Sequence, residues 1–394
     1  MSNRSLFLTH VAQTSPAPMA LAIKSASGIY ITDEQDKKYL DLISGIAVSN
    51  LGHGNKNVIA AIQKQANKHM HVMVYGEFIQ SPQVSLATKL CSYLPKNLQS
   101  VYFTNSGAEA VEGALKLAKR VTGRSRVVSF TNAYHGSTHG ALSIGGSEFF
   151  KNAFRPLLPE CYHFNYNDGQ IFDFLDGQVA AVIFEYVQAE AGNLIPDPNF
   201  LFQLAARCKE EGILLIADEI QTGMGRTGSL FALEQHDFTP DILLVGKAFG
   251  GGMPLAAFIS SYDYMQALTS QPVLGHITTF GGHPVCCAAA EAALDDLIAL
   301  ELLASVTEKG ELFKFRLKHR AIKKLNAKGL MVALHFESFE INKKIIDKCL
   351  NLGMITDWFL YAPQALRIAP PLSITTNEIN QACDLLLQAI DESI

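Results

Sequence analysis

The chain has 394 residues, of which 48% are hydrophobic and 18% are charged, and its formal net charge is −5 at pH 7. These values are typical of a soluble globular protein with more than one domain, and the negative charge excludes the basic surface of a nucleic-acid-binding protein. The seven cysteines show no CxxC spacing, no signal peptide is recognisable, and no apolar run is long enough to span a bilayer. We therefore expect a cytoplasmic protein with reduced cysteines that binds neither nucleic acid nor a membrane.

Near the N-terminus, residues 28–32 and 39–42 flank a group of turn residues and predict a hairpin. The middle of the chain then alternates short apolar stretches with helical periodicity, which indicates an α/β layered domain with a parallel sheet. The predicted strands cover residues 101–104, 127–130, 179–184, 213–217, 242–245 and 255–260.

A long helical segment begins after about residue 290, and a mixed strand and helix tail follows it. We expect a large domain over residues 46–290. Residues 1–45 and 291–394 would then form a second, smaller domain together.

Residues 105–110, Asn-Ser-Gly-Ala-Glu-Ala, lie between a predicted strand and a predicted helix over residues 108–121. Ser106 can cap this helix and Glu109 can bond back, which is a structural role. The free backbone N–H groups of a helix start, next to Gly107, also suit a phosphate. The motif alone favours the structural role, but its alignment with the polar strand ends described below favours an anion site.

Residues 133–136, Ala-Tyr-His-Gly, follow the predicted strand 127–130. Tyr134 could stack on a flat cofactor ring, although an isolated tyrosine is more often part of a core or a surface. His135 is more often a structural histidine with its hydrogen bonds satisfied. Because ligands bind at the carboxyl ends of parallel strands, the position of Tyr134 makes a ring-stacking role as well supported as a structural one.

Two predicted strands end in side chains that could carry chemistry. Asp218 follows residues 213–217, and Lys247 follows residues 242–245 and precedes three glycines. Alone, Asp218 would be a helix cap and Lys247 a solvated loop lysine. A lysine that forms a Schiff base and an aspartate that keeps a pyridine nitrogen protonated are what a pyridoxal phosphate (PLP) enzyme needs. In its apolar context Lys247 should also have a lowered pKa.

Three further features are weak when each is considered alone. Arg367 precedes Ala-Pro-Pro and either joins two domains or binds a substrate carboxylate. Glu190 is far from Arg367 in the sequence. The loop 278–284, Thr-Thr-Phe-Gly-Gly-His-Pro, has the hydroxyl and glycine residues of an anion contact, but such loops are common.

Together and in order, these segments resemble the class-III PLP-dependent aminotransferases, which include acetylornithine, ornithine and 4-aminobutyrate aminotransferases. The resemblance covers nearly the whole chain, and its joint match is far more specific than any single motif. The matching segments are residues 41–48, 52–53, 105–110, 134–136, 185–192, 218–228, 247–254, 278–284 and 366–372. The resemblance implies the α/β fold of type I PLP-dependent transferases, with a mostly parallel seven-stranded sheet in the large domain and a small α+β domain.

The resemblance also implies cofactor-binding roles. Lys247 would form the Schiff base and later move a proton, and Asp218 would pair with the pyridine nitrogen. The remaining expected contacts are Gln221 at the phenolic oxygen, Tyr134 and Ile220 on the two faces of the ring, His135 beside it, and Ser106, Gly107 and Ala108 at the phosphate. Thr279 would reach the phosphate of the neighbouring subunit, which implies a homodimer.

For the substrates, the resemblance implies that Arg367 binds the carboxylate of the oxo acid. Glu190 would neutralise Arg367 when the other substrate presents no carboxylate there. Acetylornithine, ornithine and 4-aminobutyrate enzymes carry an arginine where this chain has Ser137, and Ile46 stands where an aromatic residue lines the ornithine site. His283 replaces the asparagine of the acetylornithine group, as in several ω-amino acid and amine transaminases.

The sequence therefore predicts an aminotransferase that needs PLP and no metal. We expect a ping-pong transfer of an amino group from an amine or ω-amino acid donor to a 2-oxo acid such as 2-oxoglutarate or pyruvate. The alternatives on the same scaffold are an aminomutase, a racemase, a decarboxylase or a non-catalytic binding protein. The last of these would have no need of Lys247, Asp218 and Gln221 together. A dinucleotide-dependent dehydrogenase is excluded because no G-x-G-x-x-G follows a strand.

Overall fold

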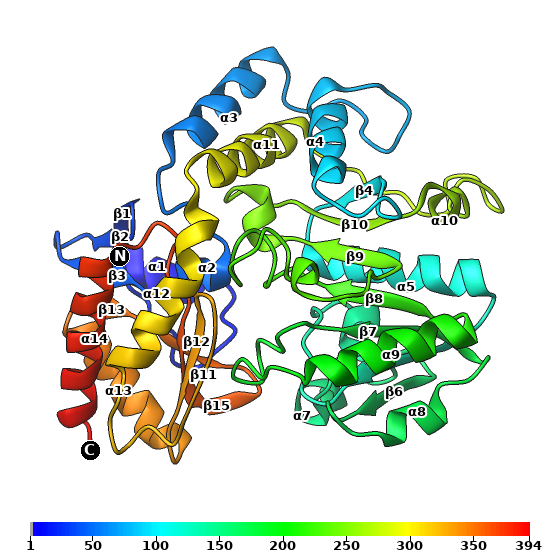
Figure 1. Cartoon of the computed structure of the whole chain (residues 1–394). Coiled ribbons are helices and arrows are strands. Elements are labelled where there is room, and N and C mark those ends of the chain that lie inside the picture. Colours follow the sequence, from blue (N-terminus) through cyan, green and yellow to red (C-terminus); the bar gives the residue numbers. More distant parts are fainter. Residues whose placement is uncertain (1–2) are drawn as a thin grey trace.

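A computed structural model of the protein describes residues 3–394 and contains three sheets (Figure 1). The largest has seven strands and lies in the part of the molecule formed by the middle of the chain. Its strand order is β4 (Ser100–Thr104), β10 (Ala256–Ser260), β9 (Ile242–Val245), β8 (Leu214–Asp218), β7 (Val179–Phe184), β5 (Arg126–Phe130) and β6 (Cys161–Phe164). Only β10 runs antiparallel to its neighbours, so the predicted mostly parallel seven-stranded sheet is confirmed.

The central strands are buried on both faces because successive side chains pack into different helical layers. Ala181 and Ile183 of β7 belong to the same apolar cluster as helix α5 (Gly107–Thr122). Val182 and Phe184 face the other way and share a cluster with helix α9 (Pro198–Glu211). The sheet is therefore a rigid middle layer, and its strand ends are fixed in place.

The predicted strands of this sheet all form within one residue of their expected ends, and the predicted helix is α5, which ends at left-handed Gly123. Strand β6 was not predicted, because it is only four residues long, only partly buried, and interrupted by His163. The expected capping box is wrong in one detail. Ser106 caps Glu109 N at 3.2 Å, but the Glu109 carboxylate bonds to Asn105 N at 2.7 Å instead of to the cap residue.

The two ends of the chain build the other two sheets. One has the order β1 (Ile23–Ser27), β2 (Tyr30–Asp33), β3 (Lys38–Asp41) and β13 (Met354–Ile355), and the other has the order β11 (Lys324–Lys328), β12 (Met331–His335), β15 (Ala362–Ile368) and β14 (Asp357–Phe359). The predicted N-terminal hairpin is confirmed as β2 and β3. Strand β3 also pairs in parallel with β13, so residues more than three hundred positions apart share one sheet.

The remaining helices cover these sheets and bridge between them (Figure 1). The expected domain boundary at residue 290 falls inside one of them, α11 (Pro284–Ala299), and the division into two domains stays a prediction. These helices are α1 (Asn3–His10), α2 (Ser44–Ala47), α3 (Lys56–Lys68), α4 (Ser81–Ser92), α6 (His139–Ser143), α7 (Glu148–Lys151), α8 (Gln170–Phe174), α10 (Tyr262–Gln266), α11 (Pro284–Ala299), α12 (Leu302–Arg316), α13 (Phe339–Asn351) and α14 (Thr376–Asp391), with short 3₁₀ turns at Asn152–Phe154, Ala232–Gln235 and Lys247–Gly250.

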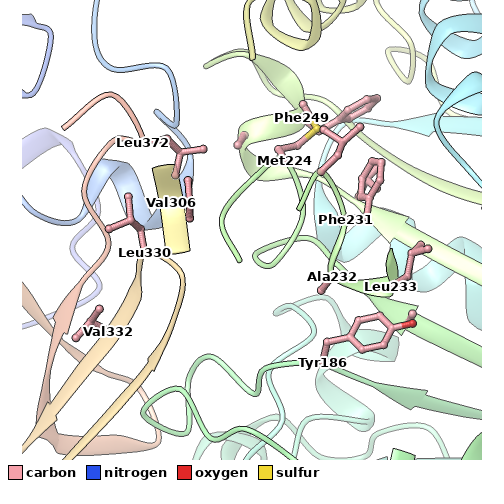
Figure 2. Close-up of a cluster of buried hydrophobic side chains, with 14 of the residues drawn as sticks. Tyr186, Met224, Phe231, Ala232, Leu233, Phe249, Val306, Leu330, Val332 and Leu372 are labelled. Atoms are coloured by element: carbon pink, nitrogen blue, oxygen red, sulfur yellow. The ribbon is translucent and has the colours of Figure 1, made fainter. Parts of the chain in front are cut away.

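One apolar core runs through both parts of the molecule. Figure 2 shows Tyr186, Met224 and Phe249 on one side of it and Leu330 and Leu372 on the other. A buried cation adds a polar link between the parts: the Arg226 guanidinium donates to the carbonyl oxygens of residues 330 and 370 and to Asn50 Oδ1. In the described part of the chain, no helix combines the length and apolar character needed to cross a membrane.

Candidate active site

A cavity of about 480 Å³ opens at the carboxyl edge of the seven-stranded sheet. Five strands of the sheet, β4, β5, β7, β8 and β9, point the same way, and each is followed by a segment that lines the cavity. These lining segments are residues 106–108, 134–138, 185–190, 218–222 and Lys247. The strand-end placement inferred from the sequence therefore brings these segments together.

Lys247 follows β9 after a single residue, Gly246, and it has a left-handed backbone with φ = 49°. Such a conformation is uncommon for a residue with a side chain, and strained residues of this kind cluster at functional sites. Its Nζ donates to Gln221 Oε1 at 3.1 Å. Burial lowers the pKa of Lys247, and the nearby Glu190 carboxylate only partly offsets this, so the predicted direction of the shift is confirmed.

Asp218, the last residue of β8, has both carboxylate oxygens engaged. Oδ2 lies 2.7 Å from His135 Nδ1, and Oδ1 accepts from Ile220 N at 3.0 Å. Burial alone would lower the pKa of His135, but the hydrogen bond and charge of Asp218 raise it. Only one of the two ring nitrogens of His135 has a hydrogen-bond partner, because Nε2 is buried with no partner in the described chain.

The start of α5 forms one wall of the cavity, lined by Ser106, Gly107 and Ala108, and the first N–H groups of a helix have no partner within the helix. Gly107 is confined by the Ile220 side chain, since a Cβ would lie 2.8 Å from Ile220 Cδ1. Gly136, at φ = 130°, is equally confined, because a Cβ would lie 2.6 Å from the Cβ of Ala108. Gly136 therefore lets its backbone approach the backbone of Ala108 at a helix N-terminus, and Gly107 leaves space for Ile220; a helix N-terminus of this kind suits an anion.

Glu185 lines the same cavity but was not among the predicted site residues. It is buried, its Oε2 accepts from Ala189 N at 3.1 Å, and its Oε1 has no partner in the described chain. Burial raises the pKa of Glu185 to about 8 despite the opposing charge of His135. A signal was present, because Glu185 follows β7 directly, just as Asp218 closes β8.

Glu190 and Arg367 form a buried two-point ion pair. The Arg367 nitrogens Nη1 and Nη2 donate to Glu190 Oε1 and Oε2, both at 2.9 Å. Glu190 lines the cavity, whereas Arg367, on β15, is only 3% exposed and lies behind it. In this arrangement Glu190 stands between the guanidinium and the cavity.

Tyr134 and Ser137 lie at the mouth of the cavity. The Tyr134 hydroxyl is 3.2 Å from Ser137 Oγ, and Ser137 is exposed. The ring centre of Tyr134 lies 6.4 Å from that of Tyr361, which in turn lies 5.2 Å from that of Phe150. Tyr361 and Phe150 were not predicted, since they come from segments with no motif.

Besides Arg367, two predicted site residues do not line the cavity. Ile46 is partly exposed and has a left-handed backbone with φ = 62°. Thr279 is exposed, and its carbonyl oxygen lies 2.8 Å from His71 Nε2. Within residues 3–394, no group of three or more His, Cys, Asp or Glu side chains is arranged to hold a metal ion.

The chain is similar in sequence and in fold to aminotransferases. A family model described as aminotransferase class-III matches residues 11–390. The acetylornithine aminotransferase of Bacillus subtilis is 38% identical over 374 residues, which are 93% of this chain and 94% of that protein. The putrescine aminotransferase of Pectobacterium atrosepticum is 36% identical over 90% of this chain and 80% of its own length.

Among solved structures, the ornithine aminotransferase of Toxoplasma gondii, with PLP partly occupying its active site, superimposes with a TM-score of 0.91. It is 29% identical to this chain, and the match covers 99% of this chain and 93% of that protein. This likeness and the seven-stranded sheet confirm the expected type I fold.

Proposed function

Because this chain belongs to the class-III aminotransferases, we propose that it moves an amino group from an amine or ω-amino acid donor to a 2-oxo acid such as 2-oxoglutarate or pyruvate. The cofactor is PLP, which this family uses. The observation that carries the proposal is the convergence of Lys247, Asp218 and the α5 N-terminus on one cavity.

The residues around the cavity fit PLP in charge and shape. The α5 N-terminus and the confined Gly107 and Gly136 offer backbone donors for a phosphate. Asp218, supported by His135 at 2.7 Å, offers a negative charge for the pyridine nitrogen. Lys247 offers an amine for the aldehyde, and Gln221, 3.1 Å from that amine, is placed for the phenolic oxygen.

When bound, PLP supplies an electron-poor ring that accepts the electron pair left when a donor carbon loses its proton. The chain has to supply the proton carrier, and burial lowers the pKa of Lys247, so its amine releases a proton more readily than that of an exposed lysine. Asp218 has to face the ring, and its contacts with His135 Nδ1 and Ile220 N hold both of its oxygens in place. Burial of the cavity floor excludes water from these transfers.

The acceptor half of the reaction uses the Glu190–Arg367 pair. A 2-oxo acid brings a carboxylate that can take the place of Glu190 on the guanidinium fork. A donor without a carboxylate at this point leaves the pair closed, so no buried charge loses its partner. One cavity can then receive two unlike substrates in a ping-pong sequence.

The donor is proposed from the mouth of the cavity. Of the residues that line it in the described chain, Lys247 is the only lysine or arginine, and Ser137 offers only a hydroxyl. A donor with an α-carboxylate would find no cation there, whereas an apolar chain would meet Tyr134. The donors named for the relatives, acetylornithine, putrescine and ornithine, all carry an amino group at the end of a methylene chain.

We also propose that two copies of the chain share their active sites. Thr279 is exposed and does not line the cavity of its own chain. Its loop carries exposed apolar side chains, as expected of a surface that another chain covers. These are Val273, Leu274, Ile277 and Phe280. A homodimer would bury them and let Thr279 reach the phosphate in the other subunit.

Absorption spectroscopy tests this proposal directly. The purified protein with PLP should be yellow, and amine donors, added one at a time without oxo acid, should bleach that colour when they react. Adding 2-oxoglutarate or pyruvate should then restore it. A yellow protein that no donor bleaches would favour an aminomutase, a racemase or a decarboxylase. The intact Glu190–Arg367 pair argues against these, since they need no external oxo acid.

A further inference from the structure

Arg367 is held from two directions by two different carboxylates. Its fork, Nη1 and Nη2, points to Glu190, as described above. Its third nitrogen, Nε, donates to Asp357 Oδ1 at 3.0 Å, on the side of the guanidinium away from the fork. The two carboxylates therefore do not compete for the same N–H groups.

The position of Asp357 is set by the sheet. Asp357 on β14 is the direct cross-strand partner of Arg367 on β15, so the two side chains leave the sheet on the same face. The next residues complete the enclosure: Trp358 O accepts from Nη2 at 3.3 Å, and the Phe359 ring lies 4.4 Å below the guanidinium carbon. Arg367 is thus held in place by its own hairpin.

The same hairpin also holds Glu190. The Leu360 N–H donates to Glu190 Oε2 at 2.9 Å, and the Tyr361 N–H donates to the Glu190 carbonyl at 3.0 Å. The backbone beside Glu190 has anchors of its own, because Gly192 O accepts from Asn326 Nδ2 at 2.8 Å and lies 3.1 Å from His335 Nε2. The Glu190 side chain can therefore rotate away while its backbone stays in place.

Two carboxylates facing one guanidinium leave an excess of negative charge while the pair is closed. Burial raises the pKa of Asp357 to about 6, although the charge of Arg367 opposes this, so Asp357 is mostly ionised at neutral pH. When Glu190 leaves, Arg367 still has one carboxylate partner, and the cost of an unpaired buried charge does not arise.

On the basis of the proposed aminotransferase function, we propose that Asp357 is a positioning residue for the oxo acid. It keeps the Arg367 fork aimed at the cavity and compensated in charge during the exchange of Glu190 for the carboxylate of the acceptor. Asp357 does not touch either substrate.

The test compares the two half-reactions of the holoenzyme. Asp357→Ala should raise KM for 2-oxoglutarate and pyruvate about tenfold or more, the size expected for losing a hydrogen bond to a charged group. The rate at which an amine donor bleaches the yellow colour of this variant should differ from the wild-type rate by less than about twofold. Asp357→Asn keeps an acceptor oxygen for Nε but not the charge, so its KM should lie between those of Asp357→Ala and wild type.

Asp347→Ala is the matched control, because it removes another carboxylate from this part of the molecule, one that forms an exposed pair with Lys343. It should leave both half-reactions unchanged. If Asp357→Ala folds poorly, Asp357→Thr suits a strand and is too short to reach Nε, and it has the same expected effect on KM.

The proposal is overturned if KM for the oxo acids stays at the wild-type value in Asp357→Ala or Asp357→Thr. It is also overturned if both half-reactions fall equally and Asp357→Asn restores neither, since a purely structural residue behaves in that way. A wild-type protein that no donor bleaches would instead contradict the aminotransferase function itself.

Discussion

The cofactor side and the acceptor side of this cavity are built by different means. The cofactor side uses residues that directly follow parallel strands, so a single rigid sheet positions Asp218 and Lys247. The acceptor side uses a cross-strand neighbour, Asp357, and a loop residue from the other part of the molecule, Glu190. The first arrangement suits catalytic groups that have to keep fixed positions relative to one another, and the second suits an ion pair that has to open and close.

Replacing Lys247 by alanine should break the cofactor side and leave the acceptor side intact. We expect turnover to fall by at least about 10⁴-fold, the upper end of a general acid–base contribution. The hydrogen bonds of the Glu190–Arg367 pair do not involve this amine, so circular dichroism and the unfolding temperature of the PLP-free protein should stay close to wild type. Exposed Lys64→Ala is the control, and full turnover in Lys247→Ala would contradict the proposed mechanism.

A mixing experiment should show whether the cofactor side is shared between two chains. Thr279→Glu would place a negative charge against the partner's phosphate and should weaken PLP binding at both sites of a homodimer. Co-expressed with Lys247→Ala, it forms heterodimers in which one site has both wild-type residues. Random pairing should then restore about a quarter of wild-type activity at limiting PLP.

Thr269→Glu, on the same exposed stretch, is the control for this mixing experiment. It should bind PLP like the wild type. No recovery of activity in the mixed Thr279→Glu and Lys247→Ala preparation would show that Thr279 acts within its own chain or not at all.

Ser137→Arg should change which donors bind at the mouth of the cavity, and it should leave the Glu190–Arg367 ion pair unchanged. A guanidinium beside Tyr134 can bind an α-carboxylate, so kcat/KM for donors such as ornithine should rise roughly tenfold relative to simple amines. Steady-state kinetics with matched donors, one with and one without the carboxylate, measures the change. An unaltered donor preference would count against this view of position 137.

Glu185→Gln should give the smallest effect, a change in how stability depends on pH. The folded-state pKa of Glu185 is raised to about 8 from an ordinary value near 4.5, so the folded protein holds a proton that the unfolded chain releases. Stability should therefore fall as pH rises from about 4.5 to about 8, by up to about 1.4 kcal/mol per pH unit.

Thermal unfolding of the protein freed of PLP, compared at pH 6 and pH 8.5, measures this dependence. His135, whose pKa is also raised, contributes in the same direction and remains in both proteins. Glu185→Gln should lose less stability than wild type over this interval. Equal losses in the two proteins would mean that Glu185 is ionised at neutral pH.

Sequence reasoning reached the cofactor side because its rule is local. A short apolar run followed by a polar residue, such as Asp218 or Lys247, indicates the end of a parallel strand. The sheet then brings these strand ends to one edge. The same rule would have found Glu185. Asp357 could not be found in this way, because its role depends on which residue of β15 lies opposite. Which residues face one another across two strands is a property of the folded sheet, and no single residue of the sequence indicates it.

The parallel pairing of β3 with β13 has a consequence for the order in which the molecule can be completed. Leu40 leaves the ribosome early, but its partner, Met354, is made more than three hundred residues later. Until then, the edge of β3 has unpaired backbone groups and is a target for other strands. A nascent chain of this enzyme therefore carries an open sheet edge for most of its synthesis, and premature termination before residue 354 should yield an aggregation-prone fragment.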